Sequence, residues 1–395
     1  MNQPNLSRFA AHRLVGFSET IFAEMSALAA STGSINLGQG FPDESGPESV
    51  IEAAVAALRA GRNQYPPGHG DPLLIEAVRD HQRRHYGLNL GSDEVVITTG
   101  ATEAIAAAVL ALVNPGDEVL VIEPCYDSYP AMVQFAGGVR RSLTLTAPDF
   151  RIDPVALSEV VTPATRVLIW NSPHNPTGRV FDLAELSAIA EVAIEHDLVV
   201  ISDEVYEHLA FSPNQHIPIA TLPGMYERTI TISSAGKTFS LTGWKIGWAT
   251  GPTGLVHAVE GAKNWLSYSS GAPLQPAIAH ALRHEESFPL RLRNQLHHNS
   301  ELLHDGLAEL GLTTFTSQGT YFITTDVANL GFVSGIEFCR TIAQQVGVVA
   351  IPSSTFYPSK ESGQTQVRWA CCKRESVLRE GLERLSELRQ LDTRK

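Results

Sequence analysis

Residues 183–206, LAELSAIAEVAIEHDLVVISDEVY, decide the fold. Leu183–His196 repeats apolar residues at the spacing of an amphipathic helix, and Leu198–Ser202 is a mostly apolar run that is followed directly by Asp203. Consecutive apolar residues are typical of a strand buried on both faces, as in a parallel sheet. This stretch therefore predicts a helix followed by an inner strand of an α/β fold.

The same alternation extends outward, over about residues 90 to 290. Another helix is expected over Ala101–Leu112, and further strands are expected at Glu94–Thr99, Glu118–Ile122, Val167–Trp170, Thr229–Ser233 and Ile246–Thr250. Strands that alternate with helices favour a mostly parallel sheet covered by helices.

The C-terminal part of the chain has a different pattern. It predicts a charged helix over Glu375–Leu391 and short strands at Tyr321–Asp326, Val346–Ile351 and Val367–Cys371. The first 45 residues have no sheet partner nearby in the sequence, and we expect them to pack on this smaller unit. We therefore expect a large α/β domain over residues 46–289 and a smaller α+β domain built from residues 1–45 and 290–395.

Composition excludes several classes of protein. With 395 residues, 43% hydrophobic and 18% charged, the chain is too apolar for a disordered protein. A net charge of −13 and the lack of a basic run disfavour nucleic-acid binding. No apolar run reaches the roughly 18 residues of a membrane helix, and Met1–Pro4 lacks the basic start of a signal peptide. The four cysteines form no CxxC pair. We expect a soluble, cytoplasmic enzyme.

Two segments that follow predicted strands are suited to ligand binding. Thr98–Glu103 starts an Ala-rich helix with small residues, whose free backbone N–H groups can bind an anion; taken alone, it is more often an ordinary turn. Asn171–Gly178, NSPHNPTG, contains two X-Pro units and a glycine that impose a defined turn. That turn can aim Asn175 at a ligand, and a plain loop is the alternative.

A carboxylate and a lysine follow two other strands. Asp203 is costly to desolvate unless a cation meets it, although Asp203 or Ser202 could instead cap a helix. Lys237 lies among small residues in SSAGKT, where it either extends to solvent or performs amine chemistry such as Schiff-base formation. It is not a Walker A lysine, because the glycine of that motif would fall at Thr231.

These motifs together resemble a known family. Asn175-Pro-Thr-Gly, Asp203-x-x-Tyr206 and Ser234-x-x-Lys237, with Lys245 and Arg368 downstream, are similar to the class I/II aminotransferases of fold type I, which use pyridoxal 5′-phosphate (PLP). The resemblance covers nearly the whole chain and implies the fold type I architecture, a large domain with a mostly parallel sheet plus a smaller α+β domain.

Individual stretches resemble particular branches of that family. Gly38–Asp43 and Lys237–Trp248 are most similar to the kynurenine, glutamine and methionine aminotransferases. Phe22–Ala29, Asn63–Gly68 and Ser172–Gly178 are closer to actinobacterial N-succinyldiaminopimelate aminotransferases.

The resemblance implies a role for each residue around the cofactor ring. Lys237 would bind PLP as a Schiff base and then move a proton between the substrate Cα and the cofactor. Asp203 would pair with the protonated pyridine nitrogen. Tyr206 and Asn175 would donate hydrogen bonds to the phenolic oxygen, and Tyr126 would stack on the ring face.

It also implies a phosphate site and a carboxylate site. The phosphate would be held by Gly100, Ala101, Thr102, Ser234 and Lys245. At position 245 this chain has lysine where the aspartate aminotransferase pattern has arginine. Lysine supplies a positive charge but not the bidentate fork of arginine.

Tyr65 would reach the phosphate of the neighbouring subunit, which implies a homodimer with active sites at the interface. Arg368 would grip the substrate α-carboxylate, aided by Asn175 and the backbone N–H of Gly38. Without the resemblance, Arg368 could be a surface ion pair, Tyr126 a core aromatic and Lys245 a solvated charge.

The predicted activity is transfer of an amino group between an L-amino acid and a 2-oxo acid, with glutamate and 2-oxoglutarate as one pair. The other substrate is expected to be N-succinyl-LL-diaminopimelate, in lysine biosynthesis, or methionine, kynurenine or glutamine. A PLP-dependent C–S β-lyase is the alternative, and a PLP-binding regulator is a third.

Some features of the site stay open at this point. No HExxH motif or Cys/His cluster occurs in the sequence, so we expect no metal. Phe17, Ile21, Phe22 and Tyr126 could line an apolar pocket for an aromatic or thioether substrate. No cation for a distal carboxylate is identified.

Overall fold

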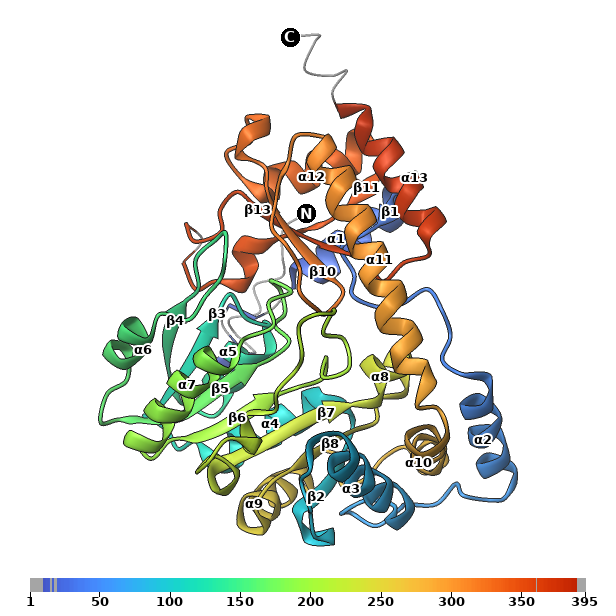
Figure 1. The fold of residues 1–395 in the computed structure, drawn as a ribbon, viewed down its shortest axis with the longest axis vertical. Helices are drawn as coiled ribbons and strands as arrows, with labels where there is room; N and C mark the ends of the chain where they lie inside the picture. The colour runs from blue at the N-terminus through green and yellow to red at the C-terminus, as the bar shows by residue number, and fades with distance from the viewer. Residues whose placement is uncertain (1–9, 15, 18–19, 360, 389–395) are drawn as a thin grey trace.

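The computed structural model describes residues 10–14, 16–17, 20–359 and 361–388. Its larger, lower part is a sheet with helices on both sides, and its upper part is a smaller unit (Figure 1). The helices α1 (Ile21–Thr32), drawn in blue, and α13 (Glu375–Ser386), drawn in red, both lie in the upper part.

Within the described residues, the larger sheet has seven strands in the order β2-β8-β7-β6-β5-β3-β4. They are β2 (Val95–Thr98), β3 (Glu118–Glu123), β4 (Val139–Thr144), β5 (Thr165–Asn171), β6 (Val199–Asp203), β7 (Thr229–Ser234) and β8 (Gly247–Thr250). β3 to β7 pair in parallel, whereas β8 is antiparallel to both β2 and β7. The predicted mostly parallel sheet is therefore confirmed.

One strand of this sheet was not predicted. β4 lies at the edge and includes Arg140 and Arg141, and most of its residues are only half-buried or exposed. An edge strand that faces solvent lacks the continuous apolar run that identified the inner strands.

Helices cover both faces because successive strand residues point to opposite sides. Leu120 of β3 and Leu168 of β5 pack with α6 (Pro154–Val160) and α7 (Leu183–Glu195). Their neighbours in sequence, such as Val121 and Ile169, pack on the other face with α4 (Gly100–Leu112), α5 (Ser128–Phe135) and α9 (Thr253–Lys263).

A third group of helices packs beside β2 and β8. It consists of α2 (Glu48–Arg59), α3 (Pro72–Tyr86) and α10 (Leu274–His284), and it encloses a core that includes Trp248. The short helix α8 (Ala235–Thr238) follows β7 directly. α3 begins at the N-cap Asp71 and ends at Gly87, whose left-handed backbone terminates the helix.

The smaller unit contains a four-stranded sheet in the order β12-β13-β10-β9. Its strands are β9 (Thr313–Thr314), β10 (Phe322–Asp326), β12 (Ile351–Pro352) and β13 (Gln366–Ala370). Its helices are α1 (Ile21–Thr32), α11 (Ser287–Glu309), α12 (Gly335–Gln345) and α13 (Glu375–Ser386).

One expectation for this unit needs correction. The predicted strand Val346–Ile351 is split, because β11 (Val348–Val349) pairs with β1 (Ile35–Asn36) while β12 joins the four-stranded sheet. The N-terminal segment therefore has a sheet partner, far away in sequence. The predicted helix end at Leu391 and residues 1–9 lie outside the described part, and the domain boundaries stay a prediction.

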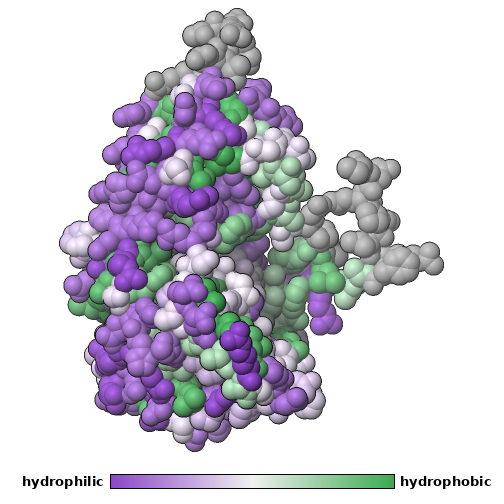
Figure 2. Space-filling model, turned by 90° about the vertical axis from the view of Figure 1, so that its right-hand side faces the viewer, coloured by the Kyte–Doolittle hydropathy of each residue, from purple (hydrophilic) through white to green (hydrophobic). Residues whose placement is uncertain are grey.

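The face shown in Figure 2 is mostly hydrophilic, with hydrophobic patches between the hydrophilic areas. Within the described ranges, no helix combines the length and the hydropathy that crossing a bilayer requires.

Candidate active site

Three neighbouring parallel strands end at one cavity of about 420 Å³. β5 ends at Asn171, β6 at Asp203 and β7 at Ser234, and Asn171 and Asp203 are paired in register. Open α/β sheets bind ligands at the carboxyl ends of their strands. The cavity is lined by eleven of the predicted site residues, namely Gly100, Ala101, Thr102, Tyr126, Asn175, Asp203, Tyr206, Ser234, Lys237, Lys245 and Arg368.

Lys237 extends from α8 into this cavity. Its Nζ donates a hydrogen bond of 2.9 Å to Tyr321 Oη, which in turn donates one of 2.6 Å to the carbonyl of Gly40. Burial lowers the pKa of the Lys237 amine to about 8, although Cys372 and Asp203 oppose that shift. A substantial fraction of the amine is therefore neutral near pH 8 and able to act as a nucleophile or base.

Asp203 is buried at the carboxyl end of β6. Its Oδ2 accepts a hydrogen bond of 2.6 Å from Tyr129 Oη, and its Oδ1 accepts one of 3.3 Å from the backbone N–H of Val205. Burial raises the pKa of Asp203 to about 6. No helix follows Asp203 directly, which removes the helix-cap explanation. Among the described residues, no cation lies within ion-pair distance of this carboxylate, so a ligand has to supply one.

Arg368 lies in β13 of the smaller sheet, lines the cavity and is buried. Its Nη1 donates to Asn175 Oδ1 at 3.0 Å and its Nη2 to the carbonyl of Gly38 at 3.1 Å. The guanidinium carbon lies 3.9 Å from the centre of the Phe322 ring. Burial lowers the pKa of Arg368 to about 10, so the group remains charged at neutral pH. Its buried Nε has no partner in the described residues and is free to bind a carboxylate.

The amino end of α4 meets Lys245. Gly100 has a left-handed backbone (φ 71°), and a Cβ added there would lie 3.3 Å from Lys245 Nζ. Lys245 itself is exposed and has a left-handed backbone (φ 54°) that turns it toward the helix start. Backbone N–H groups at a helix start together with a lysine form a suitable site for a phosphate.

Tyrosines form much of the remaining wall. Tyr206 contacts Tyr321 edge to face at 5.3 Å, and Tyr126 contacts Tyr129 in the same way at 5.8 Å. Burial raises the pKa of all four hydroxyls, which therefore stay protonated and can donate hydrogen bonds.

Other predicted residues do not line the cavity of this chain. Tyr65 is 81% exposed and contacts Tyr268 on the surface. The backbone N–H of Gly38 donates to Asn36 Oδ1 at 3.0 Å, so Gly38 faces the site through its carbonyl on Arg368. Of the residues proposed for an apolar substrate pocket, Phe22 and Tyr126 line the cavity, whereas Phe17 packs on Phe135.

Sequence reasoning missed Tyr129, Tyr321 and Asp127, all of which line the cavity or contact its central residues. Tyr129 lies three residues after Tyr126, one helical turn away, so a helix predicted at this point would have placed it beside Tyr126. Tyr321 gave no comparable signal, because it lies directly before β10 of the smaller unit, far from the other site residues in sequence.

The sequence pattern of the family described as aminotransferase class I and II matches residues 32–385. This chain belongs to that family. The probable N-succinyldiaminopimelate aminotransferase DapC of Mycobacterium tuberculosis is 51% identical over 388 residues, which cover 95% of this chain and 98% of DapC. The methionine aminotransferase of Escherichia coli is 37% identical over 381 residues, covering 95% of this chain and 97% of that enzyme.

The solved structure of N-succinyldiaminopimelate aminotransferase from Mycobacterium tuberculosis has a TM-score of 0.94 and 51% identity, and the match covers 96% of this chain and 100% of that one. The prediction of a PLP-dependent aminotransferase of fold type I is therefore confirmed. None of the three similar proteins is described as a lyase or as a regulator, so neither alternative has support.

The residues around the cavity of this aminotransferase fit PLP. The buried carboxylate of Asp203 lacks a cation, which a protonated pyridine nitrogen would supply. Lys237 offers an amine with a lowered pKa, and Lys245 and the start of α4 offer donors to a phosphate. All three groups line one cavity of about 420 Å³.

Proposed function

We propose that this aminotransferase transfers the amino group of N-succinyl-LL-diaminopimelate to 2-oxoglutarate, as a step of lysine biosynthesis. The observation that carries this proposal is the 51% identity to DapC, over a match that covers 95% of this chain and 98% of DapC. The similarity also extends to the solved structure of the same kind of enzyme, at a TM-score of 0.94.

In this proposal Arg368 binds the α-carboxylate of both substrates. Its free Nε and one Nη form parallel hydrogen bonds to the two carboxylate oxygens. Asn175 and Gly38 hold the guanidinium from the other side, at 3.0 and 3.1 Å. The amino acid is thereby oriented with its Cα toward Lys237.

Lys237 Nζ then acts as base and acid. PLP, when bound, supplies a carbonyl carbon that exchanges amines and a ring that takes up the electron pair released at the substrate Cα. Lys237 Nζ would take up the proton released at the substrate Cα and hold it until it is returned. Tyr321 Oη, 2.9 Å from Nζ, holds the amine in place between these steps. Asp203 keeps its negative charge near the ring nitrogen throughout.

In this proposal, the succinyl end of the substrate is bound without an additional lysine or arginine from the cavity of the same chain. Among the described residues that line it, the lysines and arginines are Lys237, Lys245 and Arg368, and all three are occupied by the cofactor or the α-carboxylate in this proposal. The succinyl carboxylate must therefore meet uncharged groups such as Thr20 and Gln39, or a partner subunit.

Transamination of methionine is the second candidate, favoured by the apolar walls Phe22, Ile105 and Phe322 and by the Escherichia coli relative. The test is the ratio of kcat/KM values for N-succinyl-LL-diaminopimelate, methionine, kynurenine and glutamine, with 2-oxoglutarate as acceptor. At least about tenfold preference for the first supports the proposal, and a preference for methionine replaces it with the second candidate.

The subunit arrangement in this proposal is a homodimer in which Tyr65 reaches the phosphate site of its partner. Tyr65, Trp265, Leu266 and Tyr268 form an exposed aromatic patch, of which Trp265 is 91% exposed. The segment that contains this patch also contacts the phosphate site, since Thr99 Oγ1, just before Gly100, lies 2.8 Å from Ser270 Oγ.

A further inference from the structure

A second cavity, of about 310 Å³, lies apart from the active site. It is formed by α3, α10 and the start of α11, and it shares no lining residue with the first cavity. Thr238 and Phe239, the residues after Lys237, form part of its wall, so it lies behind the helix that presents the lysine. The histidines His81, His85 and His208 also line it.

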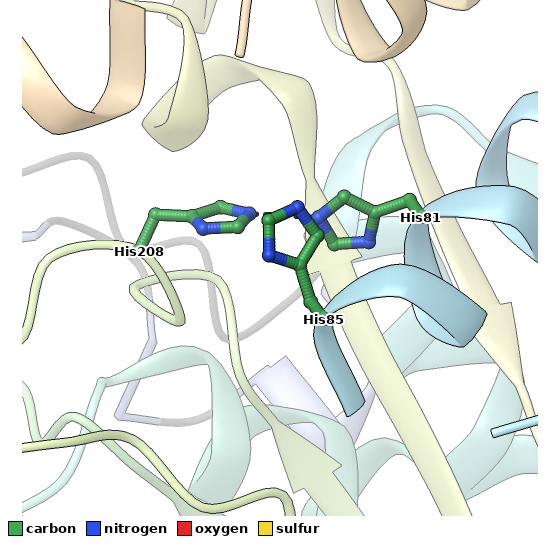
Figure 3. A group of neighbouring side chains, drawn as sticks. All are labelled: His81, His85 and His208. Atoms are coloured by element: carbon green, nitrogen blue, oxygen red, sulfur yellow. Dashed lines mark hydrogen bonds between the residues drawn. The ribbon is translucent and has the colours of Figure 1, made fainter. Parts of the chain in front are cut away.

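These three histidines converge on one point (Figure 3). One nitrogen of each ring lies within 4.8 Å of the corresponding nitrogens of the other two. His81 and His85 are one helical turn apart on α3, with ring centres at 4.5 Å, and His208 follows β6 with its ring centre 5.0 and 5.1 Å from theirs. Small rotations of the rings would bring all three nitrogens to the roughly 2.0–2.1 Å that zinc requires.

The rings are neutral, as metal ligands must be. Burial lowers the pKa of His81 to about 3 and that of His208 to about 4, against the opposing charge of Glu207. His81 Nε2 and His208 Nε2 lie 2.8 Å apart and share one hydrogen between them. Transfer of that hydrogen to Nδ1 of its own ring keeps both rings neutral and leaves two Nε2 lone pairs directed at the same point.

The surroundings of His81 contain a polar group that can fix its tautomer. Gln82 Oε1 is buried without a partner among the described residues, while its Nε2 lies 3.5 Å from His81 Nδ1. Exchange of the amide oxygen and nitrogen, which have nearly the same shape, would let Oε1 accept a hydrogen bond from Nδ1–H. The Nε2 lone pair of His81 would then be free to bind a metal. Gln82 would orient the ring through Nδ1–H, as the outer hydrogen-bond partner of a metal-binding histidine usually does.

A fixed negative charge lies close by. Glu207 is buried and accepts hydrogen bonds from Tyr86 Oη, at 2.6 Å, and from Ser233 Oγ. Two hydroxyl donors favour the ionised carboxylate. Glu207 raises the pKa of each of the three histidines, so its field reaches all of them and favours a cation at the point where they meet.

We propose that His81, His85 and His208 bind one divalent transition-metal ion, of which zinc suits three imidazoles best. The fourth position faces the second cavity and holds a water molecule. His85 is exposed and provides the path of entry. The bound ion joins α3 to the segment that follows Asp203 and Tyr206, so it stabilises the strand end on which the cofactor depends.

The experiment uses the PLP-loaded enzyme with any affinity tag removed. The protein is treated with a chelator, desalted, and mixed with ZnCl₂, and bound metal is measured by mass spectrometry after a second desalting. We expect one zinc per chain. CoCl₂ in place of zinc should give the visible absorption of tetrahedral cobalt.

Three variants separate this site from adventitious binding. His85→Gln and His208→Gln should each weaken zinc binding by at least about 100-fold, because both remove a direct ligand. His284→Gln is the matched control, since His280 and His284 on α10 also lie one turn apart, with ring centres at 4.7 Å, and form no three-ligand group within the described part of the chain. It should bind zinc as the wild type does.

Thermal unfolding of the metal-free proteins verifies that each variant is folded. Less than half an equivalent of zinc on the wild type, equal binding by His85→Gln, or loss of binding in His284→Gln would each overturn the site. None of these outcomes depends on which amino acid the enzyme transaminates, because metal content is measured without turnover.

Discussion

Tyr129 Oη donates a hydrogen bond of 2.6 Å to Asp203 Oδ2, which joins α5 to the carboxyl end of β6 below the cavity floor. Both residues are buried. Burial raises the pKa of Asp203, and the Tyr129 hydrogen bond opposes that rise and holds the value near 6. Tyr129 therefore keeps Asp203 ionised at neutral pH, the state needed to pair with a protonated pyridine nitrogen.

Replacement of Tyr129 by phenylalanine should change the pH dependence of PLP binding. A carboxylate is charged above its pKa and loses its charge as the pH falls through that value. In the wild type, PLP affinity should therefore fall as the pH drops below about 6. Without the donor the pKa rises, by about one unit for one charged hydrogen bond, and the loss should begin near pH 7. Fluorescence titration of the cofactor-free enzyme measures both curves.

Tyr226→Phe is the matched control for that experiment. Tyr226 donates to Glu94 Oε1 at 2.8 Å, outside the cavity, so the variant removes a tyrosine–carboxylate hydrogen bond of the same kind. Its PLP binding curve should coincide with that of the wild type. Coinciding curves for Tyr129→Phe and the wild type would show that Tyr129 does not position Asp203.

The rate at which PLP attaches to the cofactor-free enzyme should depend on the protonation of Lys237. Only the neutral amine is nucleophilic, and burial lowers its pKa to about 8. The rate should therefore fall about tenfold per pH unit below pH 8 and level off above it. An amine with its ordinary pKa would instead give a rate that still rises beyond pH 10. Stopped-flow absorbance distinguishes the two profiles.

Lys237→Ala should abolish transamination while the protein stays folded. The loss should be at least about 10⁴-fold, since both the covalent link and the proton transfer at Nζ disappear. Borohydride reduction followed by peptide mapping should label Lys237 in the wild type. Lys263 is an internal control: it is also buried, but it donates to the carbonyls of Gly68 and Tyr268 and does not line the cavity. A label on Lys263, or turnover by the variant, contradicts the mechanism.

The inner strands of the fold could be predicted because burial on both faces imposes continuous apolar runs. Leu198–Ser202 and Val167–Trp170 are of this kind: the second lies within β5, and the first coincides with β6 except for Leu198. β4 could not be found in this way, because an edge strand with Arg140 and Arg141 carries no such run. The pairing of β1 with β11 joins residues more than 300 positions apart, and no local pattern encodes it.

The residues of the candidate site also fall into two groups, those that local sequence patterns predict and those that only tertiary packing brings together. Asp203, Asn175 and Lys237 follow strand ends, so the sequence alone places them at one edge of the sheet. Tyr321 reaches Lys237 from the other sheet, and only the packing of the two units brings it there. The histidine cluster was missed for a similar reason. His81 and His85 show helical spacing, but His208 joins them only through tertiary structure, so no pattern in the sequence indicates the cluster.

Arg368→Lys should raise the KM of the amino acid and of the 2-oxo acid together. Lysine keeps the charge but has no planar fork, so one of two parallel hydrogen bonds is lost. That loss corresponds to a rise of about 10- to 100-fold in KM. PLP affinity should not change, because the guanidinium of Arg368 is hydrogen-bonded to Asn175 and Gly38 and not to the proposed phosphate donors.

The comparison variant for Arg368→Lys is Arg340→Lys on α12. Arg340 is paired with Glu24 on the surface, so both KM values should stay at the wild-type level. A change in KM for the amino acid alone would mean that Arg368 does not bind the α-carboxylate, since that group is common to both substrates.

The exposed aromatic patch gives a test of the proposed homodimer. Trp265 is 91% exposed, which is unusual for so large an apolar side chain unless a partner covers it. Trp265→Glu should raise the dimer dissociation constant by about 30-fold or more, because a tryptophan at the centre of an interface typically contributes at least about 2 kcal/mol. Val155→Glu, at a site on α6 that is 66% exposed, should leave it unchanged. Sedimentation velocity over a dilution series measures both dissociation constants.

If Tyr65 completes the phosphate site of the partner, the Trp265→Glu enzyme should also lose PLP at the dilutions at which it becomes monomeric. PLP retained by the monomer would separate the patch from the active site.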